Sequence, residues 1–176
     1  MKKQIFFSKS TKDTQKIGQG LAAICLKAGK NRNSALVIGL RGDLGGGKTN
    51  FSKGFAKGLG VKETIASPTF VIQKTYELKS KIEKNKTKKE RSGNRLIRKF
   101  FHIDAYRVAS EKEMETIGFS KTVRDPLNII IVEWVENILG MVPKDAVIVS
   151  FEHAGRSSRR ITIDPPQQLI FPADPC

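Results

Sequence analysis

One stretch of this 176-residue chain, residues 42–49 with the sequence GDLGGGKT, restricts the possible fold more than any other. It fits the phosphate-binding loop pattern of a glycine, four residues, and then Gly-Lys-Thr. The apolar run at residues 35–40 before it is typical of a buried strand. After it, apolar residues recur at helical spacing from Phe51 to Leu59, and Gly60 follows as a stop signal. The order of strand, glycine loop and helix predicts a nucleotide-binding α/β domain.

The residue types in the loop suit phosphate chemistry. Backbone N–H groups can wrap a phosphate chain only where no side chains intervene, which explains the glycines. The N-terminus of the following helix adds positive potential. Lys48 can reach the β- and γ-phosphates, and the Thr49 hydroxyl can bind Mg²⁺. We expect the nucleotide-binding residues of the loop to be Asp43, Leu44, Gly45, Gly46, Gly47, Lys48 and Thr49.

The composition, 39% hydrophobic and 28% charged residues, suits a soluble globular protein, and residues 1–176 are expected to form a single domain. Every apolar run is shorter than the roughly 20 residues of a membrane helix. The run at residues 5–7 is too short for the core of a signal peptide. Two cysteines do not make a disulfide framework, and Cys25 is expected in the core. We therefore expect a cytoplasmic protein.

The net charge of +15 favours polyanionic partners such as a nucleotide, RNA or an RNA-bound complex. About half of it comes from residues 79–99, which hold ten Lys or Arg and two Glu, so that +10 − 2 = +8. Two interpretations of this basic insertion stay open. In the first, it is a solvated loop or hairpin tip. In the second, it is an arm that contacts RNA; such an arm would contact only the phosphates, because the insertion lacks the interleaved aromatic residues that base stacking needs.

Periodicity and turn signals predict the remaining elements. A helix is expected from an N-cap at Ser10 or Thr11 to Gly29, and its Gly18 and Gly20 each cost about 1 kcal/mol relative to alanine but can permit close packing. An irregular, proline-rich tail is expected from Pro165. The other expected elements are strands at 4–7, 70–76, 100–107, 128–132, 146–153 and 159–164, and a helix at 111–117.

Two acids at strand ends are candidates to complete the site. A nucleotide loop needs a carboxylate that holds Mg²⁺ and orients water, usually at the end of a neighbouring apolar strand. One of Glu133 and Asp104 would hold Mg²⁺ and the other would position the attacking water; which does which stays open, and either could be a strand-end acid without a role. Thr69 is a turn hydroxyl or a switch residue that senses the γ-phosphate. His102 is expected to face away from Asp104 and to be structural.

Four motifs in this order, GDLGGGKT, SPTF, FHIDAYR and IVEW, resemble those of the TsaE family, small bacterial ATPases required for threonylcarbamoyl modification of adenosine in tRNA. The loop alone is shared by many families, but the combination in so short a chain is specific, and it covers residues 10–164. The resemblance implies a P-loop NTPase-like mixed central sheet flanked by helices, with additional antiparallel strands. It also implies Mg-dependent ATP hydrolysis that is slow in the isolated protein. With TsaD and TsaB, this activity would serve the threonylcarbamoyl modification of adenosine 37 in tRNAs that read codons starting with A.

The resemblance also implies roles for single residues. Those carried over as catalytic are Lys48, Thr69, Asp104 and Glu133. Thr49 and Glu133 match the family's Mg²⁺ ligands, and Trp134 matches the tryptophan beside the glutamate. Thr11 lies where the family's first helix meets the base, and Arg156 matches a Gly-Arg near the nucleotide.

The chain differs from the family pattern in three places. Asn50 replaces the usual second hydroxyl residue after the loop, and Gly46 replaces a common alanine. The insertion at 79–99 is longer than the short turn typical there. Because this insertion lies between two motif-bearing strands, the partner interface can differ from that of the family. Residues 79–99 are also the candidates for direct contact with tRNA.

Two other functions fit parts of the sequence. A small-molecule or nucleotide kinase would need an acceptor site, usually with a lid that carries arginines. A nucleic-acid-binding module with a vestigial loop would account for the charge, but the intact Lys48, Thr49, Asp104 and Glu133 argue against it. We expect water to be the nucleophile, with Arg107 and Arg156 as candidates for an arginine that stabilises the transition state.

Overall fold

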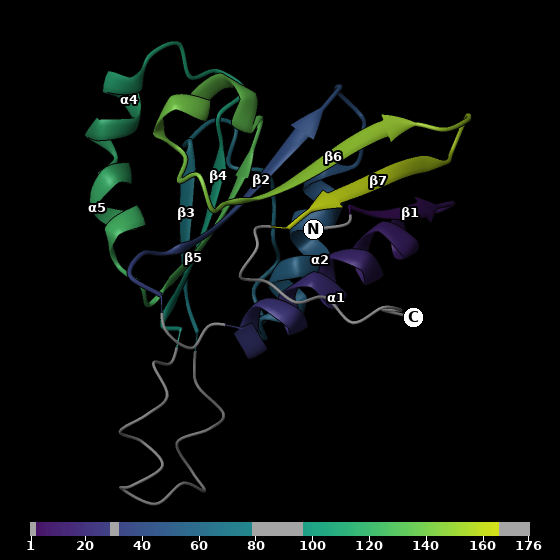
Figure 1. The fold of residues 1–176 in the computed structure, drawn as a ribbon. Coiled ribbons are helices and arrows are strands. Elements are labelled where there is room, and N and C mark those ends of the chain that lie inside the picture. The colour runs from purple at the N-terminus through teal and green to yellow at the C-terminus, as the bar shows by residue number, and fades with distance from the viewer. Residues whose placement is uncertain (1–2, 29–31, 79–96, 166–176) are drawn as a thin grey trace, which may run out of the picture.

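The computed structural model describes residues 3–28, 32–78 and 97–165 (Figure 1). Most of the basic insertion and the predicted irregular tail after Pro165 lie outside these residues. Within the described part of the chain, no helix combines the length and the apolar character that crossing a bilayer requires.

Seven strands form one mixed sheet in the order β1-β7-β6-β2-β5-β4-β3. The four strands β6, β2, β5 and β4 run parallel to one another, whereas β3, β7 and β1 pair antiparallel with their neighbours. This confirms the mixed sheet with additional antiparallel strands. The strand bounds are β1 Gln4–Ser8, β2 Leu36–Gly42, β3 Gln73–Glu77, β4 Lys99–Asp104, β5 Asn128–Glu133, β6 Val147–His153 and β7 Arg159–Asp164.

Helices cover both faces of the sheet (Figure 1). The helices α1, Thr11–Ala28, and α2, Lys48–Gly58, pack against each other on one face. The short helices α4, Glu111–Thr116, and α5, Phe119–Arg124, lie on the other face. A 3₁₀ segment, η1 Val135–Met141, follows β5 directly.

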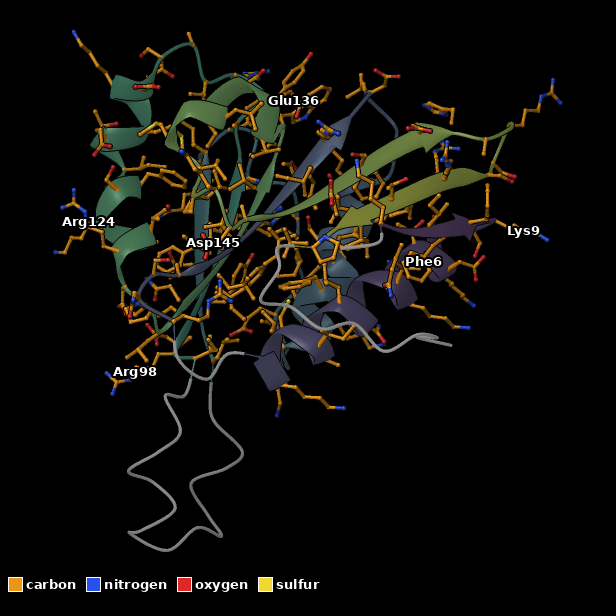
Figure 2. All side chains as sticks on the ribbon, in the orientation of Figure 1. Phe6, Lys9, Arg98, Arg124, Glu136 and Asp145 are labelled. Carbon is orange, nitrogen blue, oxygen red and sulfur yellow. The ribbon has the colours of Figure 1, made fainter. Side chains whose placement is uncertain are left out.

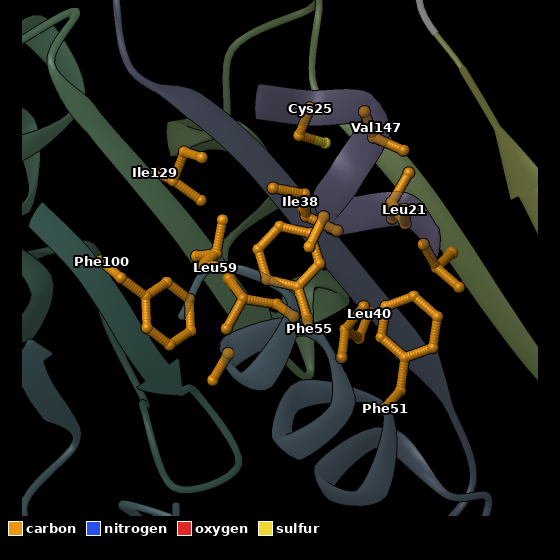
Figure 3. Close-up of a cluster of buried hydrophobic side chains, with 14 of the residues drawn as sticks. Leu21, Cys25, Ile38, Leu40, Phe51, Phe55, Leu59, Phe100, Ile129 and Val147 are labelled. Atoms are coloured by element: carbon orange, nitrogen blue, oxygen red, sulfur yellow. The ribbon is translucent and has the colours of Figure 1, made fainter. Parts of the chain in front are cut away.

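The central strands are buried on both faces, as their continuous apolar runs predict. Along β2, Leu36, Ile38 and Leu40 pack with the cluster under α1 and α2, whereas Val37 packs with the cluster under α4 and α5. Figure 3 shows the first cluster, where Phe55 of α2 lies over the sheet. Alternate residues of one strand thus belong to two cores. The same alternation places Glu133, at the end of β5, on the face that α2 covers.

Two expected strands are shorter than the sequence indicated. Residues 70–72 form a turn instead of the start of a strand, with a Val71 N–H to Pro68 carbonyl bond of 2.8 Å and a φ of +59° at Ile72. The expected strand at 100–107 ends at Asp104, because the Tyr106 N–H turns back to the Asp104 carboxylate. The sequence reading also missed α5 and η1.

Candidate active site

The glycine loop connects the end of β2 to the start of α2. Three of its glycines have a backbone that favours glycine, with φ of +131° at Gly42, +74° at Gly45 and +105° at Gly47. A Cβ on Gly42 would lie 2.3 Å from the Phe151 carbonyl oxygen, so β6 also excludes a side chain there. Gly47 directly precedes α2, whose N-terminal N–H groups therefore face the loop.

Lys48 is folded back onto its own loop. Its side chain is buried, and its ammonium donates to the carbonyl oxygens of Gly42 and of Asp43, the latter at 2.9 Å. The Nζ atom also lies 3.5 Å from the centre of the Trp134 ring, a close cation–π contact. Burial lowers the pKa of the ammonium from its ordinary value, and nearby carboxylates, Glu136 first among them, oppose this shift. The lysine thus lies in an electronegative, partly desolvated position.

Glu133 lies at the centre of a polar cluster beneath the loop. Its side chain is 2% exposed, and its Oε2 accepts a hydrogen bond of 2.7 Å from the Thr49 hydroxyl. Its Oε1 accepts from the Ser52 hydroxyl at 3.0 Å and lies 2.7 Å from Nε2 of His102. The register explains the meeting point, because Glu133 at the end of β5 pairs with Asp104 at the end of β4 and with Leu40, two residues before the end of β2.

Asp104 holds the segment that contains Thr69. Its Oδ2 accepts from the Ser67 hydroxyl at 2.7 Å and from the Thr69 hydroxyl at 2.5 Å. Its Oδ1 accepts the Tyr106 N–H at 3.0 Å. Both oxygens of this buried carboxylate are therefore occupied by protein groups in this state.

The oxygen donors of Thr49 and Glu133 fit a magnesium ion. Magnesium in nucleotide sites is usually held by one or two protein oxygens together with phosphate oxygens and water. Among residues 3–28, 32–78 and 97–165, no three or more His, Cys, Asp or Glu side chains gather in a way that could hold a metal ion by themselves.

The two predicted nucleotide-binding residues outside the loop are exposed, and a residue near each of them in the chain lies against the loop. Thr11 is the exposed first residue of α1, whereas Thr14 is buried, with its methyl group 3.7 Å from where a Cβ of Gly47 would be. Arg156 is exposed in the β6–β7 turn, whereas Arg159 donates to the Gly45 carbonyl at 3.0 Å. Thr14 and Arg159 are thus the residues of these two segments that lie against the glycine loop, and the roles of Thr11 and Arg156 in nucleotide binding stay predictions.

Sequence reasoning also missed polar residues that complete the site. Ser52 follows Lys48 by one helical turn, a spacing that could have placed it on the same face of α2. His102 was expected to face away from Asp104, which was wrong, because residues two apart on a strand share a face. Glu136 accepts the Gly42 N–H at 3.4 Å, and Figure 2 shows it at the end of the sheet where β2 finishes.

Comparison with known proteins gives one consistent family. The profile of the family described as "Threonylcarbamoyl adenosine biosynthesis protein TsaE" matches residues 8–161. A protein of Treponema pallidum named tRNA threonylcarbamoyladenosine biosynthesis protein TsaE is 30% identical, over 89% of this chain and 96% of that protein. The protein of the same name from Aquifex aeolicus is 34% identical, over 88% of this chain and 90% of its own length.

A solved structure agrees with the sequence comparisons. The crystal structure of Bacillus subtilis YdiB superposes with a TM-score of 0.66 and 25% sequence identity. The superposition covers 94% of this chain and 86% of the other. The match therefore extends over the sheet and its helices as a whole.

Proposed function

Since the chain belongs to the TsaE family, whose members are named for threonylcarbamoyl adenosine biosynthesis, we propose that it hydrolyses ATP in the pathway that modifies tRNA. The observation that carries this proposal is the junction of Lys48, Thr49 and Glu133 at one end of the parallel strands. It joins a phosphate-binding lysine to a hydroxyl and a carboxylate suited to magnesium. A buried site of this kind, placed at a glycine loop and a helix N-terminus, is suited to a nucleoside triphosphate.

We propose that the loop and Lys48 bind the phosphate chain. The ammonium now donates to neutral carbonyl groups of the loop, and phosphate oxygens would give it charged acceptors, which form stronger hydrogen bonds. The loop N–H groups from Leu44 to Thr49 would surround the same phosphates. Because the lysine is partly desolvated, its attraction to a phosphate is screened less than it would be in water.

Thr49 and Glu133 would hold magnesium. When bound, the ion would neutralise charge on the β- and γ-phosphates. The protein's part is to keep a hydroxyl and a carboxylate oxygen 2.7 Å apart on two separate elements. The buried partners of Glu133 then keep that carboxylate in place.

Asp104 is the candidate to orient the attacking water. In this state it accepts hydrogen bonds from Ser67 and Thr69, so the loop that carries Thr69 would have to release it. Release would free both a carboxylate oxygen and the Thr69 hydroxyl, which we propose senses the γ-phosphate. The exchange of partners at Asp104 would couple the loop's position to the nucleotide.

We propose that hydrolysis is slow in the isolated protein and is stimulated by a partner. Arginines can accelerate phosphoryl transfer by stabilising charge on the transferred group. Two arginine side chains of the described residues already contact the loops of the site: Arg159 donates to Gly45, and Arg107 lies 5.0 Å from the centre of the Phe70 ring. A partner that moved either arginine, or supplied one, would raise the rate.

The loops around the site carry exposed apolar side chains suited to that partner. Leu44 of the glycine loop is 75% exposed and Phe70, next to Thr69, is 85% exposed. Tyr106 is exposed beside Trp134, with ring centres 4.9 Å apart. Large exposed apolar groups are typical of interaction surfaces. We propose that TsaD and TsaB, in the cytoplasm, cover this rim.

Contact with tRNA is proposed to be indirect, through that complex, with possible direct contact by residues 79–99. The described residues that flank this insertion lie far from the loop. Figure 2 places Arg98 at the end of the sheet opposite to Glu136. The parallel register agrees, because Lys99 pairs with Asn128 at the start of β5 and Asp104 pairs with Glu133 at its end.

Reconstitution tests the proposal. Unmodified tRNA is incubated with TsaD, TsaB, the threonylcarbamoyl donor and ATP, and modified adenosine is measured by mass spectrometry. We expect repeated rounds of modification with this protein and a loss with Lys48→Ala. The exposed Lys121→Ala of α5 serves as the matched control. Modification that is the same without this protein would contradict the proposal, and ATP-dependent labelling of a metabolite would favour a kinase.

A further inference from the structure

A fully buried pair of polar side chains lies on the inner side of Glu133. His102 and Ser52 are both 0% exposed, and both reach the same oxygen, Oε1, at 2.7 Å and 3.0 Å. The other oxygen, Oε2, accepts from Thr49. The two oxygens of one carboxylate thus have different surroundings, one facing the interior and one facing the loop.

The fold gives His102 this position. His102 pairs with Ile131 in the parallel register of β4 and β5, two residues before the pair of Asp104 and Glu133. The His102 ring stacks on Phe100, with ring centres 6.4 Å apart and planes 14° from parallel. Two residues of β4 and the core beneath them therefore fix the direction in which the imidazole points.

His102 donates to Oε1 of Glu133 alone, whereas Ser52 has a second acceptor within reach. An ionised carboxylate can only accept, so Nε2 is the ring nitrogen that carries the proton in this contact. Ser52 has a single hydroxyl proton and two acceptors within reach, Oε1 of Glu133 and the Lys48 carbonyl at 3.1 Å. The serine can donate to only one of them at a time, whereas the Nε2 proton of His102 goes to Glu133.

A purely structural role does not account for histidine at this position. Nδ1 of His102 is buried and has no hydrogen-bond partner within the described residues. An unsatisfied buried acceptor costs about 1–3 kcal/mol. A wholly apolar ring next to Phe100 would avoid that cost, so the donor at Nε2 is the feature of histidine that the site uses.

We propose that His102 is a positioning residue for the magnesium ligand Glu133. The terminal torsion of a glutamate side chain is broad and roughly two-fold, so the covalent geometry alone does not fix its carboxylate plane. The bond from His102 holds Oε1 inward and thereby presents Oε2 beside Thr49, on the side where the ion would be held. This inference rests on the proposed function, because it gives His102 a purpose only if Thr49 and Glu133 hold magnesium with a nucleotide.

Two amide variants distinguish the role of Nε2 of His102 from that of Nδ1. The amide nitrogen of His102→Gln can take the place of Nε2 and donate to Glu133, whereas that of His102→Asn takes the place of Nδ1 and cannot reach it. Both variants bury a neutral amide, so their effects on folding are comparable. The binding of a non-hydrolysable ATP analogue is measured by calorimetry with Mg²⁺ and with EDTA, and the ratio of the two affinities gives the magnesium coupling. Thermal unfolding of each variant is recorded alongside.

We expect His102→Asn to reduce the magnesium coupling about 10–100-fold, as loss of a ligand's hydrogen-bond partner does in metal sites. Affinity in EDTA should change by less than about 2-fold, and His102→Gln should keep most of the coupling. Ser52→Ala should reduce the coupling less than His102→Asn does. Equal coupling in wild type, His102→Asn and His102→Gln would overturn the inference, as would a larger loss in Ser52→Ala. A wild-type protein without magnesium coupling would instead refute the proposed function itself.

Discussion

The Thr49 hydroxyl lies 2.7 Å from Oε2 of Glu133, although 84 residues separate them in the chain. One belongs to the first turn of α2 and the other to the end of β5. The pair brings together the two oxygen types that hold magnesium in nucleotide sites. The geometry of this pair, more than that of the loop alone, supports our proposal of a site for a triphosphate and its ion.

Glu133→Gln tests this pair. The amide keeps the size of the carboxylate but loses its charge and half of its acceptor capacity, so we expect the magnesium concentration for half-maximal hydrolysis to rise about 10-fold or more. The rate at saturating nucleotide should fall about 100-fold. Glu152→Gln, at an exposed glutamate of β6, is the matched control. An unchanged magnesium requirement in Glu133→Gln would remove the residue from the ion site.

Asp104→Asn should loosen the segment from Ser67 to Ile72. The carboxylate accepts from two hydroxyl groups in that segment, and hydrogen bonds to charged groups contribute about 1.5–3 kcal/mol. We expect backbone amides of this segment to exchange with deuterium about 10-fold faster than in wild type, while amides of β5 are unchanged. Mass spectrometry after pulse labelling measures both. Equal protection in the two proteins would show that other contacts hold the segment.

Gly18→Ala and Gly20→Ala should have opposite effects on stability. A Cβ on Gly18 would lie 2.4 Å from the Phe51 carbonyl oxygen and 2.9 Å from the Phe55 nitrogen, and these backbone atoms belong to α2. A Cβ on Gly20 would meet no atom of the described residues within 4 Å. We expect Gly18→Ala to destabilise by about 2–3 kcal/mol through overpacking and Gly20→Ala to stabilise by up to about 1 kcal/mol through helix propensity.

Thermal unfolding followed by circular dichroism measures this pair of variants. For a chain of this size, 1 kcal/mol corresponds to a change of about 2–4 °C in the unfolding midpoint. Two variants that changed the midpoint in the same direction would contradict the close approach of α1 and α2 at Gly18.

The buried thiol of Cys25 gives a pH-dependent contribution to stability. Burial raises the pKa of this thiol from its ordinary 9.0 to about 12. As pH rises above 9.0, the thiol ionises in the unfolded chain but stays neutral in the folded protein, so folding stability is lost between 9.0 and about 12. Below 9.0 the thiol is neutral in both states and its contribution does not vary.

Comparison with Cys25→Ala isolates this effect. The free energy of unfolding of wild type minus that of the variant should fall by about 1.4 kcal/mol between about pH 8 and about pH 10. Chemical denaturation at a series of pH values under reducing conditions measures the difference. A difference that stayed constant or rose with pH would show that the thiol is accessible to water in the folded state.

Local patterns allowed much of the fold to be predicted from the sequence. The loop at 42–49 and the apolar run before Glu133 carry their own signals, since glycine spacing and uninterrupted burial are visible within a few residues. The turn at residues 70–72 was missed because its apolar side chains suggest a strand, while Phe70 and Val71 are in fact exposed. Such exposure depends on what surrounds the segment and not on the segment itself.

The partners within the site could be predicted only in part. Glu133 and Asp104 were predicted as candidates because they end apolar strands. The contacts of His102 and Ser52 with Glu133 depend on the register of β4 against β5 and on the placement of α2, which join residues 31 and 81 positions apart. The contact of Arg159 with Gly45 likewise depends on how the β6–β7 hairpin faces the loop.

The most direct measurement of the central claim is ATP hydrolysis by the purified protein, alone and with TsaD and TsaB, beside Lys48→Ala. We predict slow, magnesium-dependent release of phosphate that the pair accelerates and that Lys48→Ala reduces about 100-fold or more, because the variant lacks the buried ammonium at the loop. Release that proceeds equally in Lys48→Ala would contradict the account.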